Sequence, residues 1–467
     1  MHGRNDLQKY FSVVDDNVVG IIAILLPIGY IFIELLNYSV FNTVVSLLVF
    51  TFILKSIFHL QGAVAKIIYV LIGLTILLLI SADNVIDILL NGALVNLPIV
   101  SILMLTPLLG ISVKVGGYDS SLRIILGKYR NNAYFYYIAF LVLTHIFSVI
   151  LNIGSILINR HLMESSNVRS KRLIANSLNR GFTTITTWSP YLGVMALVVS
   201  QLQIEWFELI SYTMGFVVIS LFVAVIVEIK TIQKEQNRLN KLNEVEAVQV
   251  LDVKSYKGKI IELVCLLILS MGLVLFIEQF TNIKIVLAIL YVSILFPLLW
   301  CLIKGQFSSY KKEVYHHIKH TIPNLQTEFT LFLVAGIFSY AFVQSSLSQK
   351  SIEILNAIFG HSVFLMAIAL SSIIIFTGIL GLHPAVMLTI FATSIVPEQI
   401  GLSPLFFAAL LLGSSGIANT VSPATAVNNL VANNLRLDVY TVSLKWNWLF
   451  ALILFITLPV YMIVVGM

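Results

Sequence analysis

The feature that most limits the fold of this chain is a series of apolar runs, each long enough to cross a membrane. A helix needs about 20 mostly apolar residues to span the hydrocarbon core of a bilayer. The runs of that length are Asn17–Leu36, Tyr38–Leu54, Ala63–Ser81, Leu97–Val113, Phe207–Ile229, Ile260–Ile277, Ile285–Ile303, Glu328–Ser345 and Trp446–Gly466. Hydrophobic residues make up 58% of the chain and charged residues 11%, so a soluble fold could not cover its surface with polar groups. The sequence therefore predicts an all-α integral membrane protein and excludes a cytosolic enzyme, a secreted disulfide scaffold and a disordered chain.

Four other apolar stretches are interrupted in the middle by Gly, Pro and hydroxyl residues. They are Ala133–Met163, interrupted at 152–155; Leu173–Gln201, interrupted at 181–190; Ser362–Val396, interrupted at 381–384; and Leu405–Asn434, interrupted at 413–423. Irregular backbone is costly inside a bilayer unless it lines a cavity or is buried in protein. Interrupted segments at matching positions of two halves are typical of transporter binding sites.

The two halves of the chain carry the same motif at the same place. The pattern Thr-x-Ser-Pro occurs at 187–190 and again at 420–423, so the two copies are separated by half the length of the chain. In each half a span, a hairpin-like stretch, a broken helix and a last span follow in the same order. The shared motif and order indicate an internal repeat, with Asn17–Leu36 as one extra helix in the first half.

The positions of the basic residues predict the topology. Basic residues at 114–130 precede the stretch 133–163, and others at 160–180, Arg180 included, follow its apolar core. If this stretch crossed the membrane, one of the two basic segments would face outward, against the positive-inside rule. We therefore expect a re-entrant hairpin, with every Lys and Arg except Lys284 and Lys350 on the cytoplasmic side.

These arguments predict about 11 transmembrane helices and two re-entrant helical hairpins in an inverted repeat. We expect a multi-pass protein of the cell membrane, with its N-terminus in the cytoplasm and its C-terminus outside. The predicted parts are a first repeat at 1–230, with an inner hairpin at 133–163 and a broken helix at 173–203; a cytoplasmic linker at 231–259; and a second, inverted repeat at 260–467, with an outer hairpin at 362–396 and a broken helix at 404–434.

The interruptions supply the candidate binding residues. Proline frees backbone carbonyls, hydroxyls add hard oxygen ligands, and half-helix N-termini suit a carboxylate. The predicted substrate-binding residues are Asn152, Gly154, Ser155, Thr187, Ser189, Pro190, His383, Pro384, Thr420, Ser422 and Pro423. The predicted ligands of a coupling ion are Asn152, Thr183, Thr184, Thr186, His383, Ser415, Ala418 and Asn419.

Each of these features also has a purely structural interpretation. The Thr-x-Ser-Pro segments could be kinked helices whose hydroxyls bond their own backbone. His383 could couple transport to protons, since imidazole titrates near neutral pH, or it could be a neutral cap at a hairpin tip. His145, in the inner hairpin, is a second and weaker candidate for a proton relay.

Several kinds of chemistry are not expected. The two cysteines, Cys265 and Cys301, lie in apolar runs and give no disulfide framework or thiolate metal site. There is no P-loop and no H-E-x-x-H motif, and we expect no catalytic residues, no enzyme activity and no organic cofactor. The net charge of +6 comes from the loops rather than from a nucleic-acid site. Nor do we expect a cluster of Arg, Lys, Asp and Glu within the spans.

The broken helices, the hairpins and the 11-span plan resemble the ion transporter superfamily, and in particular the divalent anion/sodium symporters. Those proteins carry a pattern like G-G-T-x-T-L-I-G-T-P-P-N in the broken helix after the inner hairpin, and residues 181–191 and 418–425 are similar to it. The family has Ser-Asn-Thr at both hairpin tips. Here 151–153 keeps only the Asn, 382–384 keeps none of it, and both broken helices lack Pro-Pro.

The resemblance implies a homodimer in the lipid bilayer, a fixed scaffold domain and a mobile transport domain that carries substrate in an elevator motion. It also implies Na⁺ as a coupling ion. Together with the interruptions, it predicts secondary transport of a small organic anion, a mono- or dicarboxylate, driven by Na⁺ or H⁺. Two alternatives are a flippase or membrane enzyme that acts on a lipid-linked substrate, and a channel.

Overall fold

The computed structural model describes residues 20–36, 38–60, 62–164, 166–242, 257–281, 283–360 and 362–466. Within these ranges the regular structure is helical, and nine helices are long and apolar enough to cross a membrane. The prediction of an all-α, membrane-embedded protein is thereby confirmed. The predicted cytoplasmic N-terminal segment, 1–16, lies outside the described residues.

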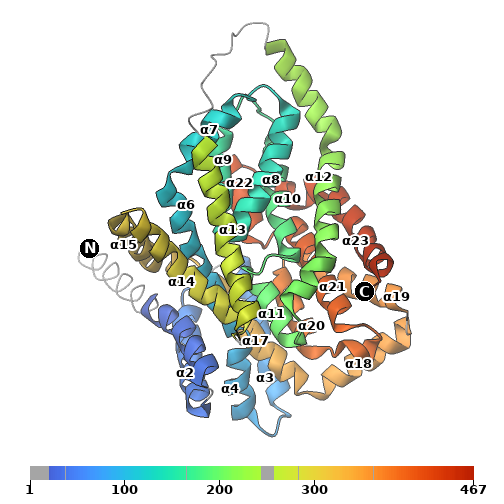
Figure 1. Ribbon diagram of the computed structural model, residues 1–467. Helices are drawn as coiled ribbons and strands as arrows, with labels where there is room; N and C mark the ends of the chain where they lie inside the picture. The colour runs from blue at the N-terminus through green and yellow to red at the C-terminus, as the bar shows by residue number, and fades with distance from the viewer. Residues whose placement is uncertain are drawn as a thin grey trace, which may run out of the picture.

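The first helices run from the bottom of Figure 1, where α2–α4 lie, up its left side to α7. They are Gly20–Leu36, α2 (Ser39–Ile57), α3 (Gly62–Leu79), α4 (Val85–Val95), α5 (Leu97–Leu105), η1 (Thr106–Leu109), α6 (Gly110–Gly116) and α7 (Tyr118–Gly127). The segment from α4 to α6 is one apolar rod of 32 residues, so it begins at Val85 and not at Leu97 as predicted. Pro98 and Pro107 stand in the first turns of α5 and η1, where a proline costs no hydrogen bond.

The middle of the chain forms the first hairpin, the first broken helix and a long helix. Its elements are α8 (Ala133–Leu151), α9 (Gly154–Met163), α10 (Lys171–Thr183), η2 (Thr184–Thr187), α11 (Gly193–Leu202) and α12 (Trp206–Leu242). The last of these runs well past Ile229, where we expected it to end. Most of the predicted linker 231–259 therefore overlaps helix α12 or residues 243–256, which lie outside the described residues.

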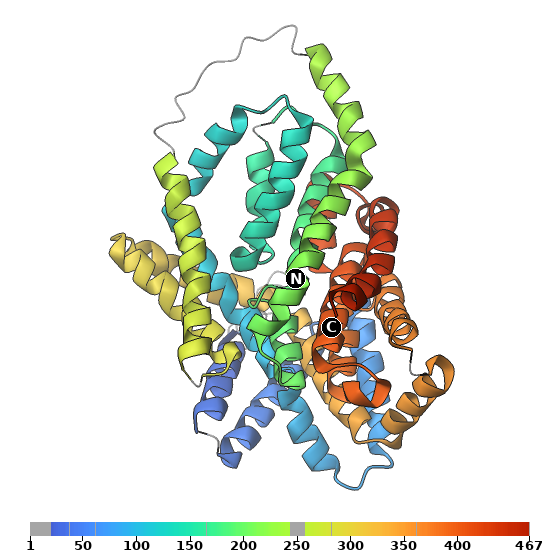
Figure 2. The ribbon, with the colours of Figure 1, turned by 45° about the vertical axis from the view of Figure 1, so that its right-hand side comes forward.

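The second half repeats this order of elements. It comprises α13 (Lys257–Phe280), α14 (Ile285–Ile303), α15 (Phe307–His316), η4 (His317–Thr321), α16 (Ile322–Asn324), α17 (Gln326–Val343), α18 (Ser346–Phe359), α19 (Val363–Ile379), α20 (Pro384–Ser394), η5 (Pro397–Ile400), α21 (Pro404–Val421), α22 (Ala426–Leu435), η6 (Thr441–Lys445) and α23 (Trp446–Val465). Figure 2 shows α19–α23, in orange to red, grouped beside the green helices α10–α12.

The two hairpins, α8–α9 and α19–α20, lie toward opposite ends of the molecule. The loop after α9 is at the end where α7 lies, whereas α18 and α20 are at the other end (Figure 1). Each hairpin packs its first helix along a broken helix: α8 along α10, and α19 along α21. The hairpins therefore hold the broken helices from two sides.

The two broken helices have the same local structure. Helices α10 and α21 begin at positions 171 and 404, and helices α11 and α22 occupy 193–202 and 426–435. These bounds recur at the same offset as the two Thr-x-Ser-Pro motifs. The hydroxyls of Ser170 and Ser403 cap the starts of α10 and α21, and Gln203 and Arg436 follow the ends of α11 and α22 with φ values of 52° and 51°. The same residue spacing thus produces the same helix starts and stops in both halves.

Candidate functional site

The broken helices run antiparallel, and the helical ends just before their breaks contact each other. The Lys171 ammonium at the start of α10 donates to the Leu435 carbonyl at the end of α22, at 2.9 Å. Further along, the Thr420 hydroxyl donates to the Thr183 hydroxyl at 2.8 Å, and the Asn419 amide donates to the Thr186 hydroxyl at 3.5 Å. The last pair is separated by 233 residues, so these are equivalent residues of the two halves, in contact with each other.

Glycines allow the helices to approach this closely. A Cβ on Gly416 would lie 3.2 Å from the Thr183 carbonyl, and one on Gly181 would lie 2.6 Å from the Leu141 carbonyl. Both glycines are helical, as is the whole segment 413–421, which we predicted to be part of the interruption. That prediction was wrong because the glycines serve helix packing; the break itself occupies only 422–425. In the first half the break is likewise limited to 188–192.

Aromatic residues tie the first break to other helices. The Trp206 indole, at the start of α12, donates to the Trp188 carbonyl at 2.8 Å. The Trp188 indole donates to Nε2 of His145 at 3.1 Å, and Nδ1 of that ring bonds the Thr184 hydroxyl at 2.8 Å. Because an indole N–H can only donate, Nε2 is the acceptor and His145 is neutral in this arrangement.

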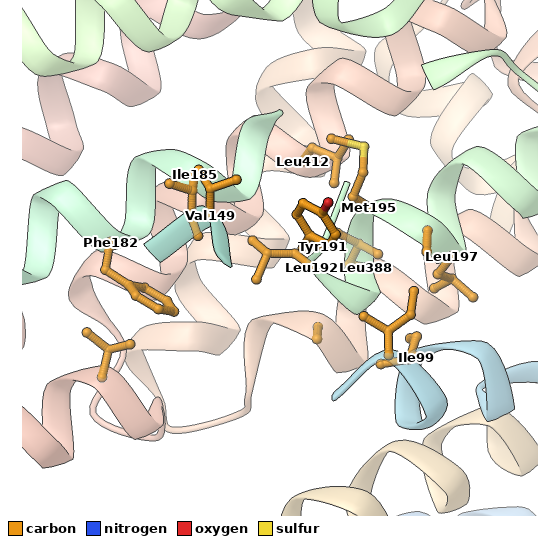
Figure 3. Packing of buried hydrophobic residues seen from close by; sticks show 14 of the residues in the cluster. Ile99, Val149, Phe182, Ile185, Tyr191, Leu192, Met195, Leu197, Leu388 and Leu412 are labelled. Atoms are coloured by element: carbon orange, nitrogen blue, oxygen red, sulfur yellow. The ribbon is translucent and has the colours of Figure 1, made fainter. Parts of the chain in front are cut away.

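Apolar side chains fill the space beside the first break. Tyr191, Leu192 and Met195 lie near Leu388 of α20 and Leu412 of α21 in Figure 3, and all of them are buried. The Tyr191 hydroxyl donates to the Ser270 carbonyl of α13 at 2.9 Å. The first break is therefore anchored on α8, α12 and α13 and packed against α20 and α21.

The second break is held by its own residues instead. The Asn428 side-chain nitrogen donates to the carbonyls of Asn419, Thr420 and Ser422, at 3.0, 3.3 and 2.8 Å. The Thr425 hydroxyl donates to the Ser422 carbonyl at 3.3 Å. The Ser422 hydroxyl accepts from the backbone nitrogen of Ala424 at 3.2 Å, while Pro423 begins the turn. The carbonyls at the end of α21 thus have donors close by.

The hairpin tips lie apart from the central crossing. At the first tip, Asn152 has a φ of 49°, and the hydroxyl of Ser155 bonds that of Ser148 at 2.6 Å, next to exposed Gly154. At the second tip, Nδ1 of His383 accepts from the backbone nitrogen of Ala385 at 3.3 Å, which makes it an N-cap of α20. The ring also packs edge-on against Phe332.

The second hairpin contacts the end of α21 at one glycine of its first helix, Gly378 of α19. A Cβ on Gly378 would lie 3.3 Å from Cβ of Ala418, 3.5 Å from Pro384 and 3.7 Å from Cβ of Ser422.

The structure brings most predicted residues of the broken helices together, Thr183, Thr186, Thr187 and Asn419 among them. The tip residues Asn152 and His383 each stand in a separate environment.

A buried ion-pair cluster joins α10 to the membrane-spanning helix α12. Arg180, which we placed in a basic loop, lies within α10 and is fully buried, as is Glu228 of α12; the two bond at 3.0 Å. Arg172 pairs with the same carboxylate at 2.9 Å. The guanidinium of Arg180 also donates to Asn447, to Tyr137 and to backbone carbonyls of α12 and α23, so none of its five N–H groups is left over.

Two cavities adjoin these elements. One of about 10 Å³ lies at the crossing and is lined by Thr183, Thr187, Ser220 and Thr420, with room for about one water molecule. The other, of about 320 Å³, lies between α6–α7 and the first hairpin and is lined by residues such as Tyr118 and Phe147. Only the second is in the size range of small-molecule sites.

The resemblance implies Na⁺, and the two breaks differ in how well they fit it. Hard cations bind hydroxyl and carbonyl oxygens. At the first break the Ser189 hydroxyl is fully buried and has no hydrogen-bond partner among the described residues, so an oxygen is free to bind an ion. Ser415 of α21 has a free buried hydroxyl too, within the same described part of the chain. At the second break the carbonyls face an amide nitrogen, and a cation does not fit.

Sequence reasoning missed Asn179, Arg180, Asn428, Trp206 and Glu228. One signal was present for the α10 residues. The polar side chains follow each other at the spacing of one helix face, at 176, 179, 180, 183, 184 and 187, so the stripe could have shown that Arg180 is helical and faces protein. Asn428 had no such signal, because its role depends on the turn that precedes it.

No known protein family and no curated protein matches this chain.

Proposed function

We propose that this chain is a secondary active transporter that moves a small organic anion across the membrane by an elevator mechanism. The observation that carries the proposal is the pair of broken helices, which have equivalent bounds in the two halves, run antiparallel and meet near their breaks. Interrupted helices in the two halves of an inverted repeat form the binding sites of secondary transporters. The same arrangement supports membership of the ion transporter superfamily.

In this proposal eleven spans and two hairpins form two domains. The mobile domain contains the hairpins, the broken helices, α12 and α23. The fixed domain contains α2–α6, α13, α14 and α17, in which α17 packs along α3 and α4 while α14 packs along η1 and α5. The chain would form a homodimer through the fixed domain, with its N-terminus in the cytoplasm. Ser120 and Ser166 flank the first hairpin, so both should lie on the cytoplasmic side if this hairpin is re-entrant. Single cysteines at these positions, in a protein without Cys265 and Cys301, should then react alike with an impermeant thiol reagent.

The substrate would be held by half-helix starts at the breaks and tips. Helices α9, α11, α20 and α22 all begin at an interruption, and a helix start offers free N–H groups and a partial positive charge that suit a carboxylate. Coupling would be to Na⁺ at the first break or to protons. The alternative, a flippase or membrane enzyme, would need charged ligands for a headgroup, and the N–H groups of buried Arg180 are already used within the protein.

The direct test is uptake into liposomes of mono-, di- and tricarboxylates, with and without Na⁺ and proton gradients. Asn152→Ala, Thr187→Ala, Thr420→Ala and Ser422→Ala should each weaken uptake while the folded yield stays near that of wild type. The loss of a hydrogen bond to a charged substrate costs about 1.5–3 kcal/mol in binding. Wild-type affinity in all four variants, or no uptake of any anion under any gradient, would contradict the proposal.

A further inference from the structure

The carbonyl groups at the second break converge on a single nitrogen atom. Helix α21 ends at Val421, so the last carbonyls of the helix lose their backbone partners. Two of these oxygens, from Asn419 and Thr420, and the carbonyl oxygen of Ser422 in the break lie 2.8–3.3 Å from the side-chain nitrogen of Asn428. The two shorter distances are those of ordinary N–H···O hydrogen bonds, and the third, longer contact shares one of the two N–H groups of the amide.

The hydrogen-bond network fixes the orientation of this amide. The other amide atom, Oδ1 of Asn428, accepts a hydrogen bond from the side-chain nitrogen of Asn179 in α10. If the amide were reversed, its oxygen would face three carbonyl oxygens, and two nitrogens would face each other. Only the observed orientation places donors opposite acceptors.

A neighbouring side chain extends this pattern to the rest of the turn. The side-chain nitrogen of Asn429 donates to the carbonyls of Pro423 and Thr425, both at 2.9 Å. Two adjacent asparagines therefore serve five carbonyl oxygens of one break. A set of oxygens that converge on one point is the arrangement that binds a hard cation, and here the positive end of an amide dipole stands at that point.

The first break has no equivalent of this amide. The residue that matches Asn428 in the first half is Met195, an apolar residue packed beside the break (Figure 3). The hydroxyl of Ser189, which matches Ser422, is buried without a partner among the described residues. The two breaks thus share a backbone plan, but of the two only the second has a side-chain amide nitrogen among its carbonyl oxygens.

We infer that the side-chain amide of Asn428 takes the place of a coupling cation at the second break, so that any coupling cation binds at the first break alone. This inference rests on the proposed transport function for its meaning, but it concerns ion binding, which is measurable without a substrate. It assigns Asn428 as a residue that determines ion specificity. It also means that the two halves do not each contain a cation site, despite their matching breaks.

The test compares thermal unfolding of the purified full-length protein in NaCl and in choline chloride at equal ionic strength. Asn428→Asp replaces the donor with an oxygen that faces the same three carbonyls, so the variant should gain a melting temperature that rises with NaCl beyond any response of wild type. Asn434→Asp, an equal charge change at an exposed position of the same helix, should show no such gain.

A folded Asn428→Asp protein without a gained Na⁺ response would overturn the inference. So would a wild-type Na⁺ response that Asn428→Asp abolishes, because the cation would then bind at the second break. If Asn428→Asp yields no folded protein, Asn428→Ala decides in its place, since it opens the same carbonyls to solvent ions and should also gain a Na⁺ response. If liposome uptake fails, these outcomes can still be interpreted, because thermal unfolding in NaCl measures ion binding without transport.

Discussion

The two breaks have nearly the same backbone structure but differ in the side chains that hold it in place through hydrogen bonds. In the first break the key bonds reach far along the chain: Trp206 to Trp188, His145 to Trp188 and Tyr191 to Ser270 span 18, 43 and 79 residues. In the second break the bonds of Asn428 to the freed carbonyls span six to nine residues. A carbonyl of the first break, that of Trp188, is paired by the indole of another helix, whereas the carbonyls of the second break are paired by an amide of the next helix turn.

The two breaks differ in how many other helices they are bonded to, and this should decide how far the effect of a substitution spreads. The first break is tied to α8, α12 and α13, so a change in its structure must disturb helices outside the broken helix. The second break is closed largely on itself, and its links to α10 and η2 run through the side chains of Asn179, Thr183 and Thr186. We therefore expect substitutions at the first break to act on the whole fold, and those at the second to act locally.

The largest effect is expected from substitution of Arg180, a buried charged residue of the first broken helix. Arg180 has no counterpart in the second half, where position 413 is Gly. Arg180→Met leaves the fully buried Glu228 with Arg172 as its remaining cationic partner among the described residues, and breaking a buried ion pair from one side typically costs about 3–5 kcal/mol. Unfolding of the purified protein in an SDS titration should show this loss.

The matched control for that prediction is Arg172→Met, which removes the half-exposed partner of the same carboxylate. Its cost should be clearly smaller, because solvent screens part of the interaction. Equal losses from the two variants would show that the burial of Arg180 does not decide the stability of this helix.

The second prediction removes one long-range tether of the first break. Trp206→Phe keeps most of the buried ring but deletes the indole donor to the Trp188 carbonyl. The acceptor is partly buried, so its loss of a partner should cost about 1 kcal/mol, toward the lower end of the range for a buried group, and should appear as a lower unfolding midpoint. Trp448→Phe, on an exposed ring of α23, is the control, and an equal loss there would argue against the tether.

Much of the fold could be predicted because apolar length and interruption are visible in the sequence. The turns at Asn152 and near His383 lie where Gly, Pro and polar residues break apolar runs. The end of α12 and the start of α4 were missed because these helical turns carry charged and amide residues, such as Lys234 and Asn91, which lower the mean hydropathy without ending the helix. An apolar run marks the part of a helix inside the bilayer, not the whole helix.

The candidate site was predictable in outline but not in its bonds. The Thr-x-Ser-Pro segments indicated two breaks at equivalent places, and the structure has them there. The partners of the freed carbonyls could not be predicted, since Trp206 and Asn428 acquire their roles only when a turn brings them back over the break. The charge of Arg180 alone suggests a loop, whereas the helical spacing of its polar neighbours indicates a helix.

The third prediction concerns the link between the first break and α13. Tyr191→Phe removes the hydroxyl that donates to the Ser270 carbonyl and leaves the packing of the buried ring in place. The expected cost is about 1 kcal/mol, typical of one buried hydrogen bond. Tyr129→Phe, at an exposed tyrosine, should be neutral in the same unfolding measurement, and a neutral Tyr191→Phe would remove this tether from the comparison.

The smallest expected effect compares the matched serines of the two breaks. The Ser422 hydroxyl accepts one local hydrogen bond from Ala424, so Ser422→Ala should cost somewhat under about 1 kcal/mol in unfolding free energy. The Ser189 hydroxyl is buried without a partner among the described residues, and a buried polar group that is unpaired contributes nothing favourable to folding. Ser189→Ala should therefore leave stability unchanged or raise it slightly in the absence of ions.

If Na⁺ binds at the first break, the same substitution should abolish the Na⁺-dependent rise in melting temperature. A stability loss in Ser189→Ala as large as that in Ser422→Ala, measured without Na⁺, would mean that this hydroxyl bonds the protein itself and is not free for an ion.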